Sequence, residues 1–202
     1  MRTHLLTALV AAAVAVALVP AALAAGVRVR VEGQTQTIFG AAQPTVQVGG
    51  TTSALDALEA ASLAGEFYYH VKQFSFGPFV DQIGRYPGAG SNGWAIKVNG
   101  ASPQVGADKV TVKSGDVVLW YWAAFGDLGG PPTLDLRASG TNCYAVVAQD
   151  DTGKSVATSG TVLHVGSKRT VPVKGAKTCV GRHPGLVVRA TAPGAVRSNV
   201  LK

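Results

Sequence analysis

The sequence predicts a mostly β protein whose first domain combines a sheet with one helix and whose second domain consists of strands. Apolar and polar side chains alternate over residues 26–33 and 94–99, as in strands that are buried on one face. A convincing helical pattern in the mature chain occurs only over residues 54–64. Residues 133–202 divide into short strand-like segments separated by turn signals, which is typical of a small sandwich.

Residues 1–24 have the pattern of a secretory signal peptide. Arg2 and His4 precede an apolar run over residues 5–19, and Ala22-Leu23-Ala24 then forms a cleavage site. A membrane anchor is the alternative, but the run is short for a bilayer span and small residues follow it. We therefore expect cleavage after Ala24, a secreted extracellular product, and no membrane span after cleavage.

Composition divides the remaining chain into two domains. Residues 25–127 hold seven Lys or Arg and eight Asp or Glu, whereas residues 128–202 hold ten and three. Thirteen of the fourteen aromatic residues precede residue 128. Because stretches this different do not share one core, we predict a first domain at 25–125, a Gly/Pro linker at 126–132 and a second domain at 133–202.

The first domain opens with strands at residues 26–33, 35–39 and 44–48. Alternation in the first strand puts Val27, Val29 and Val31 on one face and Arg28 and Arg30 on the other. Helix-capping residues follow, with Ser53 and Asp56 spaced as in a capping box, and the helix is expected to end near Gly65.

The residues after the helix are expected to form an aromatic-rich strand, a turn at Gly77-Pro78 and a loop. Within that loop, residues 88–93 match G-x-G-x-x-G, the spacing of a phosphate-binding turn. A strand rather than a helix follows this spacing. We therefore predict a flexible loop and no phosphate site.

Three further strands are expected at residues 94–99, 109–113 and 117–125. The last one is apolar on both faces, with Leu119 and Tyr121 on one and Trp120 and Trp122 on the other. Such a strand is central and needs cover on both sides. We expect Trp120 and Trp122 to face away from the helix.

Residues 27–125 also resemble a known family, the transcobalamin-like C-terminal domains, which are small β-grasp modules. The resemblance rests on these short motifs: Phe76-Gly77-Pro78-Phe79-Val80, Ile83-Gly84, Gly93-Trp94, Val98-Asn99-Gly100, Gly115-Asp116-Val117 and Trp120-Tyr121. It implies a sheet with one helix on one face, and a corrinoid such as cobalamin as ligand. In that family the domain caps a corrinoid held against a separate helical domain. The present sequence shows no such domain, so we predict no bound cofactor.

The candidate ligand site is the sheet face opposite the helix. Its predicted ligand-binding residues are Trp120, Trp122, Lys97, Asn99, Arg28 and Arg30. Tryptophan rings stack on planar or ring-bearing ligands, while basic and amide groups bind a polar edge. The alternative is that both rings are buried, either in the core or against the second domain.

The second domain has two cysteines, Cys143 and Cys179, which in an exported chain predict one disulfide. Two cysteines and scattered histidines lack the spacing of a zinc site, so no metal is expected. Short strands joined by one disulfide resemble a small immunoglobulin- or fibronectin-like sandwich.

No enzyme motif is present: the chain lacks G-x-S-x-G and H-E-x-x-H, and no mature histidine neighbours a paired acid. We predict a secreted, non-catalytic protein that binds a small ligand or the cell envelope. The alternative is a structural or adhesive envelope protein whose basic second domain docks on an anionic cell-wall polymer. Nucleic acid is not expected as a partner, because the chain has no recognition helix. The basic surface could also have no partner.

Overall fold

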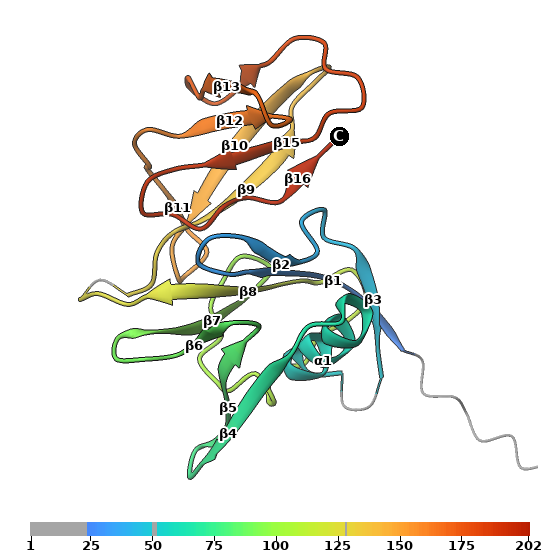
Figure 1. The fold of residues 1–202 in the computed structure, drawn as a ribbon, viewed down its shortest axis with the longest axis vertical. Helices are drawn as coiled ribbons and strands as arrows, with labels where there is room; N and C mark the ends of the chain where they lie inside the picture. Colours follow the sequence, from blue (N-terminus) through green and yellow to red (C-terminus); the bar gives the residue numbers. More distant parts are fainter. Residues whose placement is uncertain (1–23, 50–51, 128) are drawn as a thin grey trace, which may run out of the picture.

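The computed structural model describes residues 24–49, 52–127 and 129–202. These residues form one helix and sixteen strands, which confirms the mostly β fold class. We call residues 24–127 the N-terminal part and residues 129–202 the C-terminal part; they lie one above the other (Figure 1). The predicted signal peptide lies outside the described residues, apart from Ala24.

The main sheet of the N-terminal part has five strands, which we call the first sheet. Its members are β1 (Ala25–Glu32), β2 (Thr37–Phe39), β3 (Thr45–Val48), β7 (Asn92–Val98) and β8 (Val117–Ala124). β8 lies between β1, to which it is parallel, and β7, to which it is antiparallel. This confirms the central position that its two apolar faces predict.

The strand predicted at residues 109–113 is wrong. That segment makes only an isolated bridge between Thr111 and Ser53. Its backbone instead forms hydrogen bonds with the start of the helix and the residues before it. The carbonyl of Val110 accepts from Ala54 N at 2.9 Å, and Val112 N donates to Thr52 O at 2.7 Å. The first N–H groups of a helix need such partners, because they have none within the helix.

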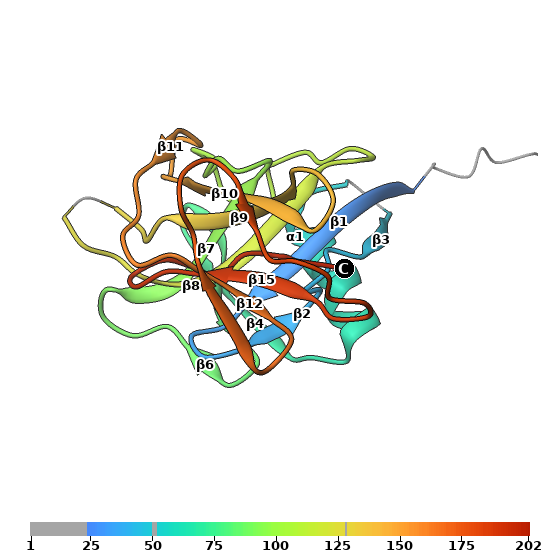
Figure 2. The same ribbon diagram turned by 90° about the horizontal axis from the view of Figure 1, so that it is seen from above.

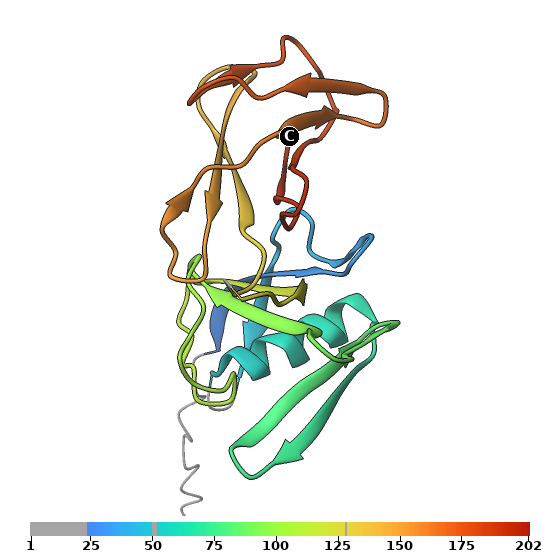
Figure 3. The same cartoon turned by 90° about the vertical axis from the view of Figure 1, so that its left-hand side faces the viewer.

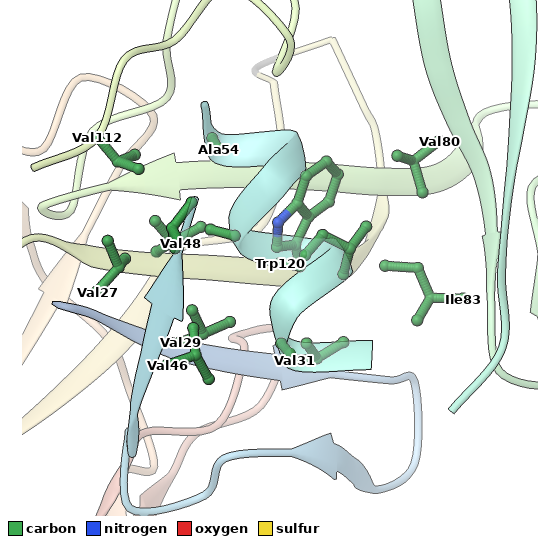
Figure 4. Close-up of a cluster of buried hydrophobic side chains, with 14 of the residues drawn as sticks. Val27, Val29, Val31, Val46, Val48, Ala54, Val80, Ile83, Val112 and Trp120 are labelled. Carbon is green, nitrogen blue, oxygen red and sulfur yellow. The ribbon is translucent and has the colours of Figure 1, made fainter. Parts of the chain in front are cut away.

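The helix α1 (Ala54–Gly65) covers one face of the first sheet (Figures 1 and 3). The predicted capping box is present, since Asp56 N donates to Ser53 Oγ at 3.1 Å and Ser53 N donates to the Asp56 carboxylate at 2.8 Å. The helix ends at Gly65, as expected, and its C-cap is Glu66, which has a left-handed backbone. Figure 4 shows the helix packed on valines of β1 and β3 and on Trp120.

A smaller sheet extends from the N-terminal part, away from the C-terminal part (Figure 3). Its strands are β4 (Tyr69–Phe74), β5 (Gly77–Ile83) and β6 (Tyr86–Pro87). β4 and β5 form a hairpin in which Phe74 is opposite Gly77, so Ser75 and Phe76 are at its tip. The predicted turn at Gly77-Pro78 is therefore two residues too late.

The C-terminal part consists of two four-stranded sheets. One contains β9 (Thr133–Ala138), β10 (Cys143–Gln149), β11 (Ser155–Val156) and β14 (Thr178–Cys179). The other contains β12 (Val162–Val165), β13 (Arg169–Pro172), β15 (Val188–Thr191) and β16 (Val200–Leu201). Leu134 and Leu136 of the former share one buried cluster with Leu163 and Val188 of the latter, as in a sandwich.

The predicted disulfide is confirmed, since Cys143 on β10 and Cys179 on β14 are bonded. The likeness to immunoglobulin domains and the division into two domains stay predictions.

The C-terminal part lies over the face of the first sheet that α1 leaves uncovered (Figures 1 and 2). Backbone hydrogen bonds join the two parts, since Ser102 N donates to Asp151 O at 2.8 Å and Val200 N donates to Ala41 O at 2.8 Å. Within the described ranges, no helix is both long enough and apolar enough to cross a bilayer.

Candidate functional site

The two tryptophans of β8 lie on the helix side of the sheet, so the prediction that they face away from it is wrong. Trp120 is only 3% exposed and belongs to the core cluster that contains the α1 residues (Figure 4). The reason is the register: Trp120 is opposite Val31 on β1 and Ile96 on β7. Residues opposite each other in paired strands point to the same side, and Val31 and Ile96 point toward the helix.

Trp122 is half-buried and packs against aromatic neighbours on that side. Its ring centroid is 5.8 Å from that of Trp94 and 6.0 Å from that of Tyr86. Its free edge lines a cavity of about 440 Å³ whose other walls are mostly glycine, alanine and proline. Neither tryptophan is therefore part of the opposite face on which the predicted site was placed.

That opposite face is covered by the C-terminal part through polar contacts. Lys97 is fully buried, and its ammonium donates to Thr133 Oγ1 at 3.1 Å, Gln149 O at 2.9 Å and Asp150 O at 2.7 Å. Burial lowers the pKa of Lys97, and the carboxylates of Asp151 and Asp150 oppose that shift. The three ammonium donors each have one partner, so Lys97 links the two parts.

Arg30 is also buried on this face. Its Nη1 donates to Arg197 O at 2.6 Å and its Nη2 to Leu134 O at 3.4 Å. Burial lowers the pKa of Arg30 to about 10, although the Glu32 carboxylate favours the charged form. Its buried Nε–H has no hydrogen-bond partner among the residues described. Leaving such a donor unpaired costs roughly 1–3 kcal/mol, which reduces what the other contacts of Arg30 contribute to stability.

Glu32, at the end of β1, holds a cluster of arginines from the C-terminal part. Its buried carboxylate accepts from Arg189 at 2.7 Å and from Arg197 at 2.9 Å, and it lies 3.6 Å from Arg30. Thr37 donates a further hydrogen bond at 3.0 Å. This cluster, which sequence reasoning missed, fixes the two parts to each other. The sequence pattern that could have indicated it is Glu32 itself, an acidic residue at the end of a strand whose polar face otherwise carries Arg28 and Arg30.

A cavity of about 540 Å³ lies between the first sheet and the C-terminal part, and we call it the interface cavity. Its charged lining residues are Arg28, Arg30, Lys97, Arg137 and Asp135. Apolar side chains complete the walls, among them Val117, Leu119, Leu134, Leu136 and Leu201. The lining therefore combines four cations and one carboxylate with an apolar surface.

Two of these cations are exposed and lightly held. Among the described residues, the Arg28 side chain donates only to the carbonyl of Gly115, at 3.4 Å, and Arg137 pairs with Asp135 at 2.7 Å. Both are accessible to a ligand, whereas Arg30 and Lys97 are buried and donate hydrogen bonds to the C-terminal part. The cavity thus has exposed charges near the solvent and buried charges in its depth.

Four of the six predicted ligand-binding residues line this cavity: Arg28, Arg30, Lys97 and Asn99. Asn99 occupies the predicted turn, with a φ of 52°, and its amide donates to Asp116 at 2.9 Å and accepts from Val117 N at 2.9 Å. The structure brings these four together but does not bring Trp120 and Trp122 to them. Sequence reasoning missed Arg137 and the apolar residues of β9, because nothing in the sequence shows that β9 faces the first sheet.

The histidines have separate partners. His164 contacts Thr191 at 2.8 Å, and His183 contacts the Tyr144 hydroxyl at 2.7 Å. Only His70 contacts a carboxylate in the described part of the chain, that of Asp81 at 2.6 Å. Partial burial raises the pKa of Asp81, but hydrogen bonds from Lys72 and His70 outweigh this and leave it below its usual range. The absence of catalysis stays a prediction.

No metal centre is visible in the described ranges: no three His, Cys, Asp or Glu side chains gather closely enough to hold an ion. The expectation of no bound cofactor stays a prediction.

Comparisons with known proteins cover part of the chain. Residues 51–124 match a family described as "Domain of unknown function (DUF4430)". This match runs from α1 to the end of β8, so it includes Lys97 and Asn99 but neither Arg28 and Arg30 nor the C-terminal part. No curated protein matches the chain. The resemblance to transcobalamin-like domains stays a prediction.

A solved structure from Ruminococcus gnavus ATCC 29149, for which metal binding has been proposed, is similar at a TM-score of 0.39 and 16% identity. The alignment covers 50% of the present chain and 97% of that chain. A likeness this distant carries no argument about the ligand of the present protein.

Proposed function

We propose that the protein is a non-catalytic binding protein that holds a small amphipathic anion in the interface cavity. The observation that supports this most is the lining, in which four cationic side chains and a single carboxylate surround an apolar wall. The volume of about 540 Å³ falls within the range of pockets that enclose small molecules.

Each part of the lining has a chemical role in this proposal. Arg28 and Arg137 are exposed guanidinium groups, which bind carboxylate, phosphate or sulfate oxygens through two parallel hydrogen bonds. Arg30 and Lys97 line the deeper part of the cavity, where their charges add to the positive potential that attracts an anion. Val117, Leu119 and Leu136 provide the apolar surface against which the body of the ligand packs.

The proposal keeps the small-ligand class that the resemblance to transcobalamin-like domains implies, and it keeps export, which residues 1–24 predict. It leaves Trp120 and Trp122 out of the site. A corrinoid remains one ligand to test among others.

Isothermal titration calorimetry tests the proposal with octanoate, octyl phosphate, naphthalene-2-sulfonate and a corrinoid. Each simple anion is paired with a neutral analogue of the same body, such as naphthalene-2-sulfonamide. We expect at least one anion to bind, its neutral analogue to bind at least ten times more weakly, and the double variant Arg28→Gln/Arg137→Gln to lose at least tenfold in affinity. Arg169→Gln, a change to an exposed arginine on β13, is the matched control. If no anion binds, or if the double variant binds as the native chain does, the proposal fails.

A second candidate function rests on a separate observation. Seven exposed cations of the C-terminal part make no ion pair within the described chain, and five of them lie between residues 168 and 182: Lys168, Arg169, Lys174, Lys177 and Arg182. We propose that they favour docking on an anionic cell-wall polymer, which predicts retention on cell-wall preparations that falls steeply as salt rises. Retention that does not respond to salt, or no retention, would remove this candidate.

A further inference from the structure

Four of the six phenylalanines of the chain are exposed, and they gather at the β4–β5 hairpin and the end of β8. Phe74, Phe76, Phe79 and Phe125 are 44%, 67%, 42% and 42% exposed. The rings of Phe74 and Phe76 stack at 5.1 Å with 6° between their planes, and Phe79 meets Phe74 edge-on at 6.2 Å. A contiguous aromatic surface of this kind marks an interaction site more often than a chance exposure.

Three of these rings line a pocket of about 350 Å³, which we call the aromatic pocket: Phe74, Phe79 and Phe125. Its remaining wall is the loop over residues 88–93, the segment with the G-x-G-x-x-G spacing. Backbone hydrogen bonds hold this wall in place, since Phe125 N donates to Ser91 O at 2.9 Å and Gly88 N donates to Asp81 O at 2.7 Å. The pocket is therefore built from three segments that are fixed to one another.

The polar groups of the aromatic pocket carry no net charge. Lys72 and Asp81 form an ion pair at 2.8 Å, so their charges compensate each other. Ser91 and Asn92 also line the pocket, and their side chains make no hydrogen bond to any other described residue. The pocket thus offers aromatic faces beside neutral hydrogen-bonding groups.

We propose that the aromatic pocket binds a neutral sugar unit of a glycan. A pyranose ring presents C–H faces that pack on aromatic rings and hydroxyl groups that bind amide, hydroxyl and carboxylate partners at its edge. Phe79 and Phe125 supply the first kind of contact, and Asn92, Ser91 and Asp81 supply the second. This site is separate from the interface cavity, and the inference goes beyond the proposed function.

Charge favours a glycan over a lipid surface as the occupant. Membrane binding by exposed aromatic side chains gains from nearby unpaired cations. Here Lys72 is paired, and the exposed cations near β13 lie at the opposite end of the molecule from the β4–β5 hairpin (Figure 1). The ion pair in the lining of the aromatic pocket instead suits a neutral, polar ligand.

Affinity electrophoresis through gels that contain neutral polysaccharides tests the proposal, followed by calorimetry with the matching oligosaccharide. The probes are soluble β-1,3-glucan, a β-1,4-linked glucan, amylose, mannan and oligomers of N-acetylglucosamine. We expect one of these to retard the protein. Phe79→Ala and Asn92→Ala should each weaken that interaction at least tenfold; Asn92→Ala leaves every aromatic ring in place, so it separates binding from the folding of the hairpin.

Two controls keep the test sharp. Leu63→Ala removes an apolar side chain on α1 that is 73% exposed and should not change retardation. The double variant Arg28→Gln/Arg137→Gln, which tests the interface cavity, should also leave glycan binding unchanged. The inference is overturned if no neutral glycan retards the protein, or if binding persists in both Phe79→Ala and Asn92→Ala. Partition into phosphatidylcholine vesicles that Phe79→Ala abolishes, without glycan binding, would likewise overturn it.

Discussion

The two faces of the first sheet are both covered, but by different means. On the helix face, Val27, Val29 and Trp120 pack with α1 into an apolar core. On the other face, Lys97 and Glu32 connect to the C-terminal part through hydrogen bonds and ion pairs. Apolar packing fills space without direction, whereas a polar network fixes a few points and leaves room between them. Because the polar contacts leave space between them, the interface cavity lies on this face of the sheet.

The largest expected effect comes from breaking the apolar face. Trp120→Ala removes a buried ring from the core, and such changes cost roughly 3–5 kcal/mol of unfolding free energy. Urea denaturation followed by circular dichroism measures the loss. Trp122→Ala is the matched variant, and it should cost less because that ring is only half-buried. An equal or larger loss for Trp122 would contradict the assignment of Trp120 to the core.

On the polar face, Glu32→Gln should have the next largest effect. The variant leaves Arg189 and Arg197 beside a neutral amide, and removing one partner of a buried ion pair costs roughly 3 kcal/mol or more. The same denaturation experiment measures it, with Asp127→Asn as a control at an exposed acid. If Glu32→Gln were as stable as the control, the arginine cluster would not hold the two parts together.

Lys97→Met should have a smaller effect, and one that depends on pH. It leaves Thr133 and two carbonyl groups without their donor, at roughly 1–3 kcal/mol. Burial lowers the pKa of Lys97 from its ordinary value of 10.5, so the folded chain releases this proton at a lower pH than the unfolded chain. The native protein should therefore gain stability relative to Lys97→Met as pH rises from neutral toward 10.5.

Denaturation of the native chain and the variant across this pH range provides the measurement for Lys97. A constant difference between them would show that Lys97 has the same pKa in both states.

The smallest expected effect on stability is that of Arg28→Gln. Its guanidinium is exposed, and its one hydrogen bond to the described part of the chain is a long one to Gly115, so the loss of unfolding free energy should be about 0.5 kcal/mol or less. A loss as large as that of Lys97→Met would mean that Arg28 holds the fold and is not free to hold a ligand.

Much of the fold could be predicted from local patterns. Alternation assigns Val29 and Trp94 to the helix side, the spacing of Ser53 and Asp56 marks the start of the helix, and two cysteines in one chain predict their bond. The first two predictions depend only on residues within one segment. The disulfide needs no choice of partner, because the chain has just two cysteines. The side on which Trp120 lies depends instead on the register of β8 against β1 and β7, which no local pattern contains.

The candidate site could be predicted only in part. Arg28, Arg30, Lys97 and Asn99 share a face by alternation, and the structure places them around one cavity. The second wall comes from β9, which is remote in sequence, so Arg137 had no signal. The aromatic pocket was missed because four phenylalanines in a sequence give no indication that their rings are exposed together.

Chemical-shift mapping tests the central claim most directly. The uniformly ¹⁵N-labelled protein is titrated with octyl phosphate, and backbone amide shifts are followed in parallel with neutral octanol. The account predicts saturable shifts on both walls of the interface cavity, at Asn99 and Gly100 and at residues 135–138, with much weaker shifts for octanol. Shifts confined to the exposed basic residues 168–182, or equal shifts for both probes, would contradict it.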